Sequence, residues 1–379
     1  MAGSGRATNG IAPGVVRSVI PKTFSCTERA QHITIFSMRY GIVFDASFTR
    51  HLTPAGHPER PERVATLLES LKNWDRLDEL IRIPTSTAQQ QWIRAVHSPE
   101  HLAQIKATSG ADFSQLDADT STSADSYQVA LLAAGSAVTL VDEITREKID
   151  GGFAVIRPPG HHAERNRAMG FCLFNNIAVA AEWAIREALA QRVAIVDFDV
   201  HHGNGTQEIF YSRSDVLYLS THQYPFYPGT GHFSEAGAGP GQGFTANFPI
   251  SAGTGDHFYC NLFRDLLLPI VRQFDPQLIL VSAGYDGHRD DPLAGMNLST
   301  EGFGALVNLL NEVADEVCGG RILYLLEGGY DLTALCDAVL LTIDTSLEPR
   351  NFDIPVTQVD DYEIYREVLR SKLSPYWEL

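Results

Sequence analysis

The chain alternates between short runs that are apolar at nearly every position and longer segments whose apolar residues recur at helical spacing. The apolar runs predict β-strands over residues 39–45, 153–157, 193–196, 216–220, 278–282 and 322–326. The helically spaced segments predict helices over residues 60–72, 126–144, 176–190, 257–274 and 300–318. Strands that are apolar throughout are buried on both faces. The pattern therefore predicts a three-layer α/β/α domain with a mainly parallel central sheet.

Residues 1–38 differ from the rest of the chain. They are rich in Ser and Thr, they contain the basic residues Arg6, Arg17, Lys22 and Arg29, and their one acidic residue is Glu28. This composition is typical of an organellar transit peptide, although a flexible tail has the same character. We expect residues 1–38 to be an N-terminal extension and residues 39–379 to be a single domain. The expected location is cytoplasmic or nuclear, with the mitochondrion or plastid as the alternative if the extension is a targeting segment.

Charge and cysteine content narrow the classes of function. The sequence has 46 acidic residues against 29 basic ones, a formal net charge of −17, which argues against direct nucleic-acid binding. No apolar run approaches the ~20 residues that cross a bilayer, so we expect no membrane insertion. The five cysteines are scattered without C-x-x-C spacing, which predicts neither a disulfide framework nor a cysteine-ligated zinc site.

Four predicted strands run directly into residues that carry chemistry. In chain order these residues are His161 and His162, then Asp197, Asp199 and His201, then Asp286, and finally Tyr330. Ligands of open parallel sheets bind outside the carboxyl ends of the strands. We therefore expect these side chains to converge on one pocket.

Asp199 and His201 are two positions apart, so in extended chain their side chains share a face. With Asp286 from another strand they form a two-Asp, one-His set, which leaves a fourth position open for water, as a catalytic zinc site requires. The alternative is a run of polar turn residues after a strand. Several unpaired carboxylates and imidazoles at the ends of buried strands would be costly, which favours the metal site.

The pair His161 and His162 follows a rigid Pro-Pro-Gly turn. A neutral imidazole beside an activated water can take its proton and later return it to a leaving group. Asp197 and Asn204 are both candidates for orienting these rings, and histidines of a surface loop are the alternative. Tyr330 follows two glycines, and its hydroxyl is a candidate donor to a developing oxyanion, although a single Tyr in a turn often serves packing alone.

Together these segments resemble the histone deacetylase family in its wider sense, which includes acetylpolyamine amidohydrolases and acetoin-utilisation proteins. The matching motifs are HPERPER at residues 57–63, RPPGHHA at 157–163, MGFCLFNN at 169–176, DFDVHHGNGTQ at 197–207, STHQ at 220–223, YPGTG at 227–231, SAGYDGHRDDPLAG at 282–295 and LEGGYD at 326–331. Motifs this long and numerous are specific. The resemblance implies an arginase-like α/β fold and a zinc-dependent amide hydrolase.

The resemblance also implies a role for each matching residue. Asp199, His201 and Asp286 would hold Zn²⁺. The implied catalytic residues are His162 as general base and acid, His161 paired with Asp197, Tyr330 on the acetyl carbonyl, and Asn204. The implied walls of a substrate tunnel are Gly170, Phe171, Tyr227 and Leu293. The implied ligands of a structural K⁺ are Asp197, Ser220 and the backbone oxygens of Asp199, His201 and Thr221.

Three positions refine the expected substrate. Asn204 and Glu327 resemble class II members, and Leu293 stands where a polyamine-selective member carries an acidic gatekeeper. An apolar residue there favours acyl-lysine over a cationic polyamine, because only a carboxylate would pair the amine charge. We expect zinc-dependent hydrolysis of the N-acetyl amide of lysine side chains in proteins or peptides. The alternative within enzymes is an acetylpolyamine or other small acetyl-amine amidohydrolase.

Other functions have less support in the sequence. Arginase-like guanidine hydrolysis with two manganese ions is disfavoured, because the His pair and Tyr330 match the deacetylase set. A non-enzymatic acyl-lysine binding module is disfavoured because every catalytic-type group is present. Serine nucleophile chemistry lacks its G-x-S-x-G motif.

Overall fold

The computed structural model describes residues 38–354 and 361–379. The predicted N-terminal extension, residues 1–38, therefore lies almost wholly outside the described residues and stays a prediction, as does its targeting role. An eight-stranded sheet runs in the order β2-β1-β5-β10-β9-β6-β7-β8, and its neighbouring strands are all parallel. Its strands are β1 Tyr40–Phe44, β2 Ile81–Arg82, β5 Gly151–Val155, β6 Val193–Asp197, β7 Val216–Gln223, β8 Thr245–Ile250, β9 Leu278–Ala283 and β10 Ile322–Leu326. The short strands β3 Ser114–Gln115 and β4 Ser121–Thr122 form a separate antiparallel pair.

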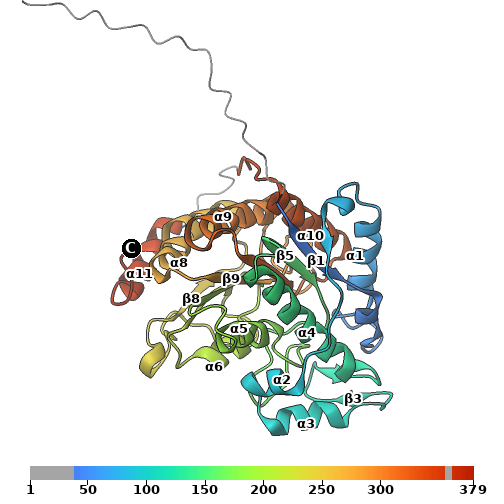
Figure 1. The fold of residues 1–379 in the computed structure, drawn as a ribbon. Coiled ribbons are helices and arrows are strands. Elements are labelled where there is room, and N and C mark those ends of the chain that lie inside the picture. Colours follow the sequence, from blue (N-terminus) through green and yellow to red (C-terminus); the bar gives the residue numbers. More distant parts are fainter. Residues whose placement is uncertain (1–37, 355–360) are drawn as a thin grey trace, which may run out of the picture. The chain divides into compact units, whose positions relative to one another are not determined.

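Helices cover both faces of this sheet, with α1, α8, α9 and α10 on one side and α4 and α5 on the other (Figure 1). The helices are α1 Glu62–Lys72, α2 Gln90–Val96, α3 Pro99–Ala107, α4 Ser126–Thr145, α5 Asn176–Arg186, α6 Asn204–Phe210, α7 Asp256–Leu262, α8 Leu268–Phe274, α9 Thr300–Cys318, α10 Leu332–Leu347 and α11 Tyr362–Leu373. Every residue of β5, β6, β9 and β10 is buried, because helices pack on both sides of these strands. The predicted three-layer architecture is confirmed.

Several predicted boundaries were wrong by a few residues. Strand β5 ends at Val155 rather than at residue 157, because the chain turns before Pro158. The helix predicted over residues 257–274 is divided by a π-helical turn, Phe263–Leu267. Strand β8 was missed, since Pro249 within it argues against a strand; it is tolerated because β8 is the edge of the sheet.

Helix α4 is long and apolar enough, by composition alone, to span a membrane, although no apolar run in the sequence suggested this. Of the most apolar 18-residue stretch of this helix, 67% is buried inside the protein. It packs against α5 and against the central strands β1, β5 and β10. Its apolar character is therefore explained by its place in the core.

The order of the strands brings the chemistry together. Strands β5, β10, β9 and β6 are consecutive neighbours in the sheet, although their order in the chain is different. These are the strands that precede the candidate site residues. Because all four are parallel, their carboxyl ends lie at the same edge of the sheet.

Candidate active site

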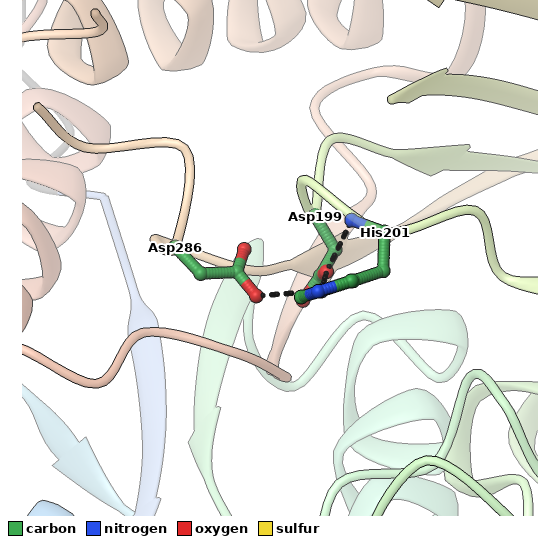
Figure 2. Close-up of side chains that lie close together, drawn as sticks. All are labelled: Asp199, His201 and Asp286. Carbon is green, nitrogen blue, oxygen red and sulfur yellow. Dashed lines mark hydrogen bonds and ion pairs between the residues drawn. The ribbon is translucent and has the colours of Figure 1, made fainter. Parts of the chain in front are cut away.

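Asp199, His201 and Asp286 form a buried cluster at this edge of the sheet (Figure 2). The Nδ1 atom of His201 lies 3.2 Å from Oδ1 of Asp199 and 3.0 Å from Oδ2 of Asp286. One ligand atom from each residue lies within 4.8 Å of the others. Two carboxylates therefore face one imidazole nitrogen across a space of the size that a metal ion occupies.

The charges of this cluster favour a cation. Both carboxylates are almost fully buried, and buried charges are paired or coordinate metals. Burial alone would lower the pKa of His201, but the carboxylates of Asp199 and Asp286 raise it to about 10. With no ion bound, the cluster would thus hold a proton between its ligand atoms. Its donor set of two carboxylate oxygens and one imidazole nitrogen fits zinc.

Backbone amides fix the ligand carboxylates from behind. The N–H of Gly328 donates to Oδ2 of Asp199 at 2.8 Å, and that of Val200 donates to Oδ1 of Asp286 at 2.9 Å. A Cβ at position 328 would lie 2.1 Å from Oδ2 of Asp286 and 2.6 Å from Oδ2 of Asp199. Only glycine permits this approach, so the turn after β10 is part of the cluster's geometry.

His161 and His162 stand side by side next to the cluster, with ring centroids 4.1 Å apart. Nδ1 of His161 lies 3.0 Å from Oδ2 of Asp197, and Nδ1 of His162 lies 2.8 Å from Oδ1 of Asn204. The two orienting partners that the sequence left open are thus divided between the two rings. One histidine faces a carboxylate and the other faces a neutral amide.

The proton affinities of the pair diverge accordingly. Burial alone would lower the pKa of His161, but the carboxylates of Asp199 and Asp197 raise it well above its ordinary value. Burial, together with the charges of His161 and His201, lowers the pKa of His162 well below its ordinary value. Such a divided pair is compatible with the predicted roles, in which His162 is the neutral imidazole that accepts a proton and His161 is its charged neighbour.

Tyr330 is held at the cluster by its backbone. Its N–H donates to Oδ2 of Asp291 at 2.7 Å, and the next residue, Asp331, caps α10 by accepting from the N–H of Ala334. The guanidinium of Arg63 lies over the Tyr330 ring, 4.9 Å from its centroid. Burial, and next the carboxylate of Asp286, raise the pKa of Tyr330 well above its ordinary value. Its hydroxyl therefore keeps its proton and can donate a hydrogen bond.

Aromatic rings surround the His pair and Tyr330. Phe171 packs edge-on against the Tyr330 ring, and Tyr227 packs edge-on against the His162 ring at 5.2 Å between centroids. Phe171 adopts a left-handed backbone, with φ of 68°, and Thr120 holds it by accepting from its N–H. Gly170 lies directly on His162, since a Cβ there would meet the ring at 2.3 Å. These positions are compatible with the predicted tunnel walls.

The remaining predicted residues lie at the border of this site. Leu293 is half-buried, and its N–H donates to Oδ1 of Asp291, whose other oxygen holds Tyr330. The pairing of β6 with β7 places Asp197 opposite Ser220, beside Thr221. Three of the five predicted potassium ligands, Asp197, Ser220 and Thr221, are thus adjacent, but their role stays a prediction. A separate cavity of about 890 Å³, lined by residues 251–258 among others, contains none of the predicted residues.

Sequence reasoning missed several residues that build the site. Oε2 of Glu327 accepts from the N–H groups of Gly160 and His161, and Tyr218 donates its hydroxyl to Oδ2 of Asp197. The sequence also predicts no role for Asp291, although this residue lies within the SAGYDGHRDDPLAG motif. Glu327 was noted only as a class II-like choice. The signal for Glu327 was its position, because an acidic residue that directly follows the apolar strand β10 is buried and needs hydrogen-bond donors. The loop that carries His161 supplies them.

Comparison with known proteins bears on this arrangement. The family model described as the histone deacetylase domain matches residues 57–345. The chain belongs to the histone deacetylase family. Histone deacetylase 10, chloroplastic, of Oryza sativa subsp. japonica is 41% identical over 320 residues, which cover 79% of this chain and 72% of that protein. The probable deacetylase of Archaeoglobus fulgidus is 37% identical over 294 residues, which cover 77% of this chain and 81% of that protein.

Solved structures agree with the family and with the fold. The crystal structure of the HD domain of HDA15 superposes with a TM-score of 0.84 at 36% identity, covering 89% of this chain and 97% of that chain. The resemblance read from the motifs and the predicted arginase/deacetylase fold are both confirmed. The name of the rice relative, with that of histone deacetylase 14, chloroplastic, of Arabidopsis thaliana, is compatible with the plastid alternative for this histone deacetylase family member.

Proposed function

We propose that this protein is a zinc-dependent hydrolase of the N-acetyl amide of lysine side chains in proteins or peptides. The observation that carries the proposal is the cluster of Asp199, His201 and Asp286. Beside it lie two histidines, one with a raised pKa and the other with a lowered pKa. Membership of the histone deacetylase family and relatives named deacetylases support hydrolysis of acetylated substrates.

The residues of the chain divide the chemical work. Asp199, His201 and Asp286 would hold the zinc, which when bound would supply Lewis-acid polarisation of the acetyl carbonyl and a more acidic water molecule. The neutral His162 takes the proton of the attacking water and then gives it to the leaving amine. Tyr330 donates its hydroxyl hydrogen bond to the carbonyl oxygen as negative charge develops there. His161, held cationic by Asp197, adds a fixed positive charge beside the reacting atoms.

The aromatic rings and Leu293 support lysine as the acetylated amine. Phe171 packs against the Tyr330 ring and Tyr227 against the His162 ring, and their apolar faces suit the methylene chain of an acetyl-lysine. Leu293 offers no carboxylate to pair the second amine of a polyamine. A small acetylated amine is the second candidate, and it is tested by the same assay.

The experiment compares turnover of acetyl-lysine peptides, N-acetylputrescine and N-acetylspermidine by the purified protein, with and without a zinc chelator. We expect the acetyl-lysine peptides to be hydrolysed with a higher kcat/KM than the acetylpolyamines. We expect the chelator to abolish turnover, and added zinc to restore it. The variant Asp199→Ala serves as the inactive control. Faster turnover of the acetylpolyamines would overturn the lysine assignment, and full activity in the chelator would overturn the zinc assignment.

A further inference from the structure

We propose that Glu164 is a positioning residue that fixes the tautomer of His162 through the side-chain amide of Asn204. The inference rests on the proposed function, in which His162 accepts a proton from water. In the sequence Glu164 follows His162 by two residues and precedes Met169 by five. Its carboxylate accepts a hydrogen bond from the side chain of Asn204.

The amide of Asn204 is held in one orientation by its neighbours. Its Oδ1 lies 2.8 Å from Nδ1 of His162, while its Nδ2 lies 2.7 Å from Oε1 of Glu164 and 3.3 Å from the Met169 sulfur. A carboxylate and a thioether can accept hydrogen bonds but cannot donate them. The opposite orientation would set the amide oxygen against these two acceptors. Glu164, with Met169, therefore selects the orientation in which the oxygen faces His162.

That orientation decides which ring nitrogen of His162 carries the proton. An amide oxygen only accepts, so Nδ1 of His162 must donate, and the lone pair of the neutral ring lies on Nε2. Only in this tautomer can Nε2 take a proton from water. If the amide were reversed, its N–H would face Nδ1, the proton would move to Nε2, and the ring would have no free lone pair toward the reaction.

Glu164 is itself fixed from the side away from the site. Its carbonyl oxygen accepts from Nδ1 of the buried His97 at 2.9 Å, and its N–H donates to the carbonyl of Arg167 at 2.9 Å. Nε2 of His97 in turn accepts from the N–H of Asn175. The loop therefore presents the Glu164 carboxylate at a set position before any substrate arrives.

The first test replaces the acceptor with a donor of opposite charge. In Glu164→Lys the introduced ammonium attracts Oδ1 of Asn204 and reverses the amide. We expect kcat on an acetyl-lysine peptide to fall by roughly 10²-fold or more, the usual contribution of a general base, while KM changes little. Glu208→Lys is the matched control. Its exposed carboxylate accepts from the N–H of Arg165 in the same region, and it makes the same change of charge without a contact to Asn204.

The second test is a rescue that a merely structural role would not give. Asn204→Asp removes the amide, so that the group facing His162 accepts whatever its orientation. In the double variant E164K/N204D the introduced ammonium and carboxylate form an ion pair, and Nδ1 of His162 again finds an acceptor. We expect kcat to recover to near wild type. A Glu164→Lys variant with wild-type kcat, or a double variant no faster than Glu164→Lys, would overturn the proposal.

A third measurement does not depend on turnover. The ¹⁵N spectrum of histidine-labelled, zinc-loaded protein, with His162→Ala identifying the signal, distinguishes an Nδ1–H from an Nε2–H imidazole. We expect the Nδ1–H form in the wild type and the Nε2–H form in Glu164→Lys. The same form in both proteins would overturn the inference. If the wild type hydrolysed no acetyl amide, the proposed function would fall, while this spectrum would still decide the role of Glu164.

Discussion

Glu59 belongs to a charge cluster that no solvent reaches. Its Oε1 accepts hydrogen bonds from Nε of Arg157 and, at 3.3 Å, from Nη1 of Arg63. The Glu59 and Arg157 side chains are 0% exposed, and that of Arg63 is 1% exposed. Arg63 also donates to the carbonyl oxygens of Gly329 and Glu327, in the turn that carries Tyr330. Glu59→Gln would leave two guanidinium groups buried without a counter-charge.

Two estimates of the cost agree. Breaking a buried ion pair by removing one partner costs about 3–5 kcal/mol. Burial alone would raise the pKa of Glu59, but Arg157, His51 and Arg63 lower it from 4.5 to about 2. This difference corresponds to about 3 kcal/mol of stability. Because the pKa is depressed in the folded state, the contribution is complete above pH 4.5 and is lost as the pH falls toward 2.

The assay is thermal unfolding of the wild type, Glu59→Gln and the control Glu62→Gln, followed by tryptophan fluorescence at pH 7. Glu62 lies on the exposed side of α1, and its substitution by Gln removes the same charge as Glu59→Gln does. We expect Glu59→Gln to unfold on the order of 5 °C lower than the wild type, and the control to unfold close to it. The difference in unfolding temperature between the wild type and Glu59→Gln should become smaller as the pH falls below 4.5. An unfolding temperature equal to that of the control, or a gap independent of pH, would refute the reasoning.

Three further predictions, which involve four substitutions, concern the chemistry directly. Tyr330→Phe should lower kcat by roughly 10²-fold, as expected for loss of an oxyanion donor, while zinc content stays at wild-type level; unchanged turnover would remove the hydroxyl from the mechanism. Asp199→Ala and His201→Ala should each lose zinc by atomic absorption together with activity, so a variant with stoichiometric zinc would refute the ligand assignment. Leu293→Glu should shift the ratio of kcat/KM values from acetyl-lysine peptides toward N-acetylputrescine, and a constant ratio would contradict its selective role.

Much of the architecture was predictable because a strand that is buried on both faces is apolar at nearly every position. Strand β10 and helix α9 were predicted with the observed bounds, since each is apolar at the spacing of its own structure. Strand β8 was not predicted, because it is an edge strand with Asn247 and Pro249 in its interior. Its place depends on pairing with β7, and pairing with a distant segment leaves no local signal.

The site was predictable to the extent that it follows the strands. Asp199, His201 and Asp286 could be grouped because each comes directly after a strand of one parallel sheet. The support around them could not be read in the same way. Glu164 reaches Asn204 across a gap of 40 residues, and Arg63 reaches Gly329 across 266. Such contacts are set by loop conformation and by the packing of whole elements, which no sequence spacing specifies.

The place of β10 in the sheet has a consequence for how the protein matures. Of the described strands it is the last in chain order, and so the last of them to leave the ribosome, yet it lies between β5 and β9 rather than at an edge. Until it inserts, the earlier strands have unpaired neighbours, and the turn that supplies Gly328 to the Asp199 carboxylate is missing. Nascent chains of this topology are slow to close and prone to associate. The candidate site is therefore complete only once β10 and the turn after it have been synthesised, so a chain that stops before Gly328 lacks a finished site.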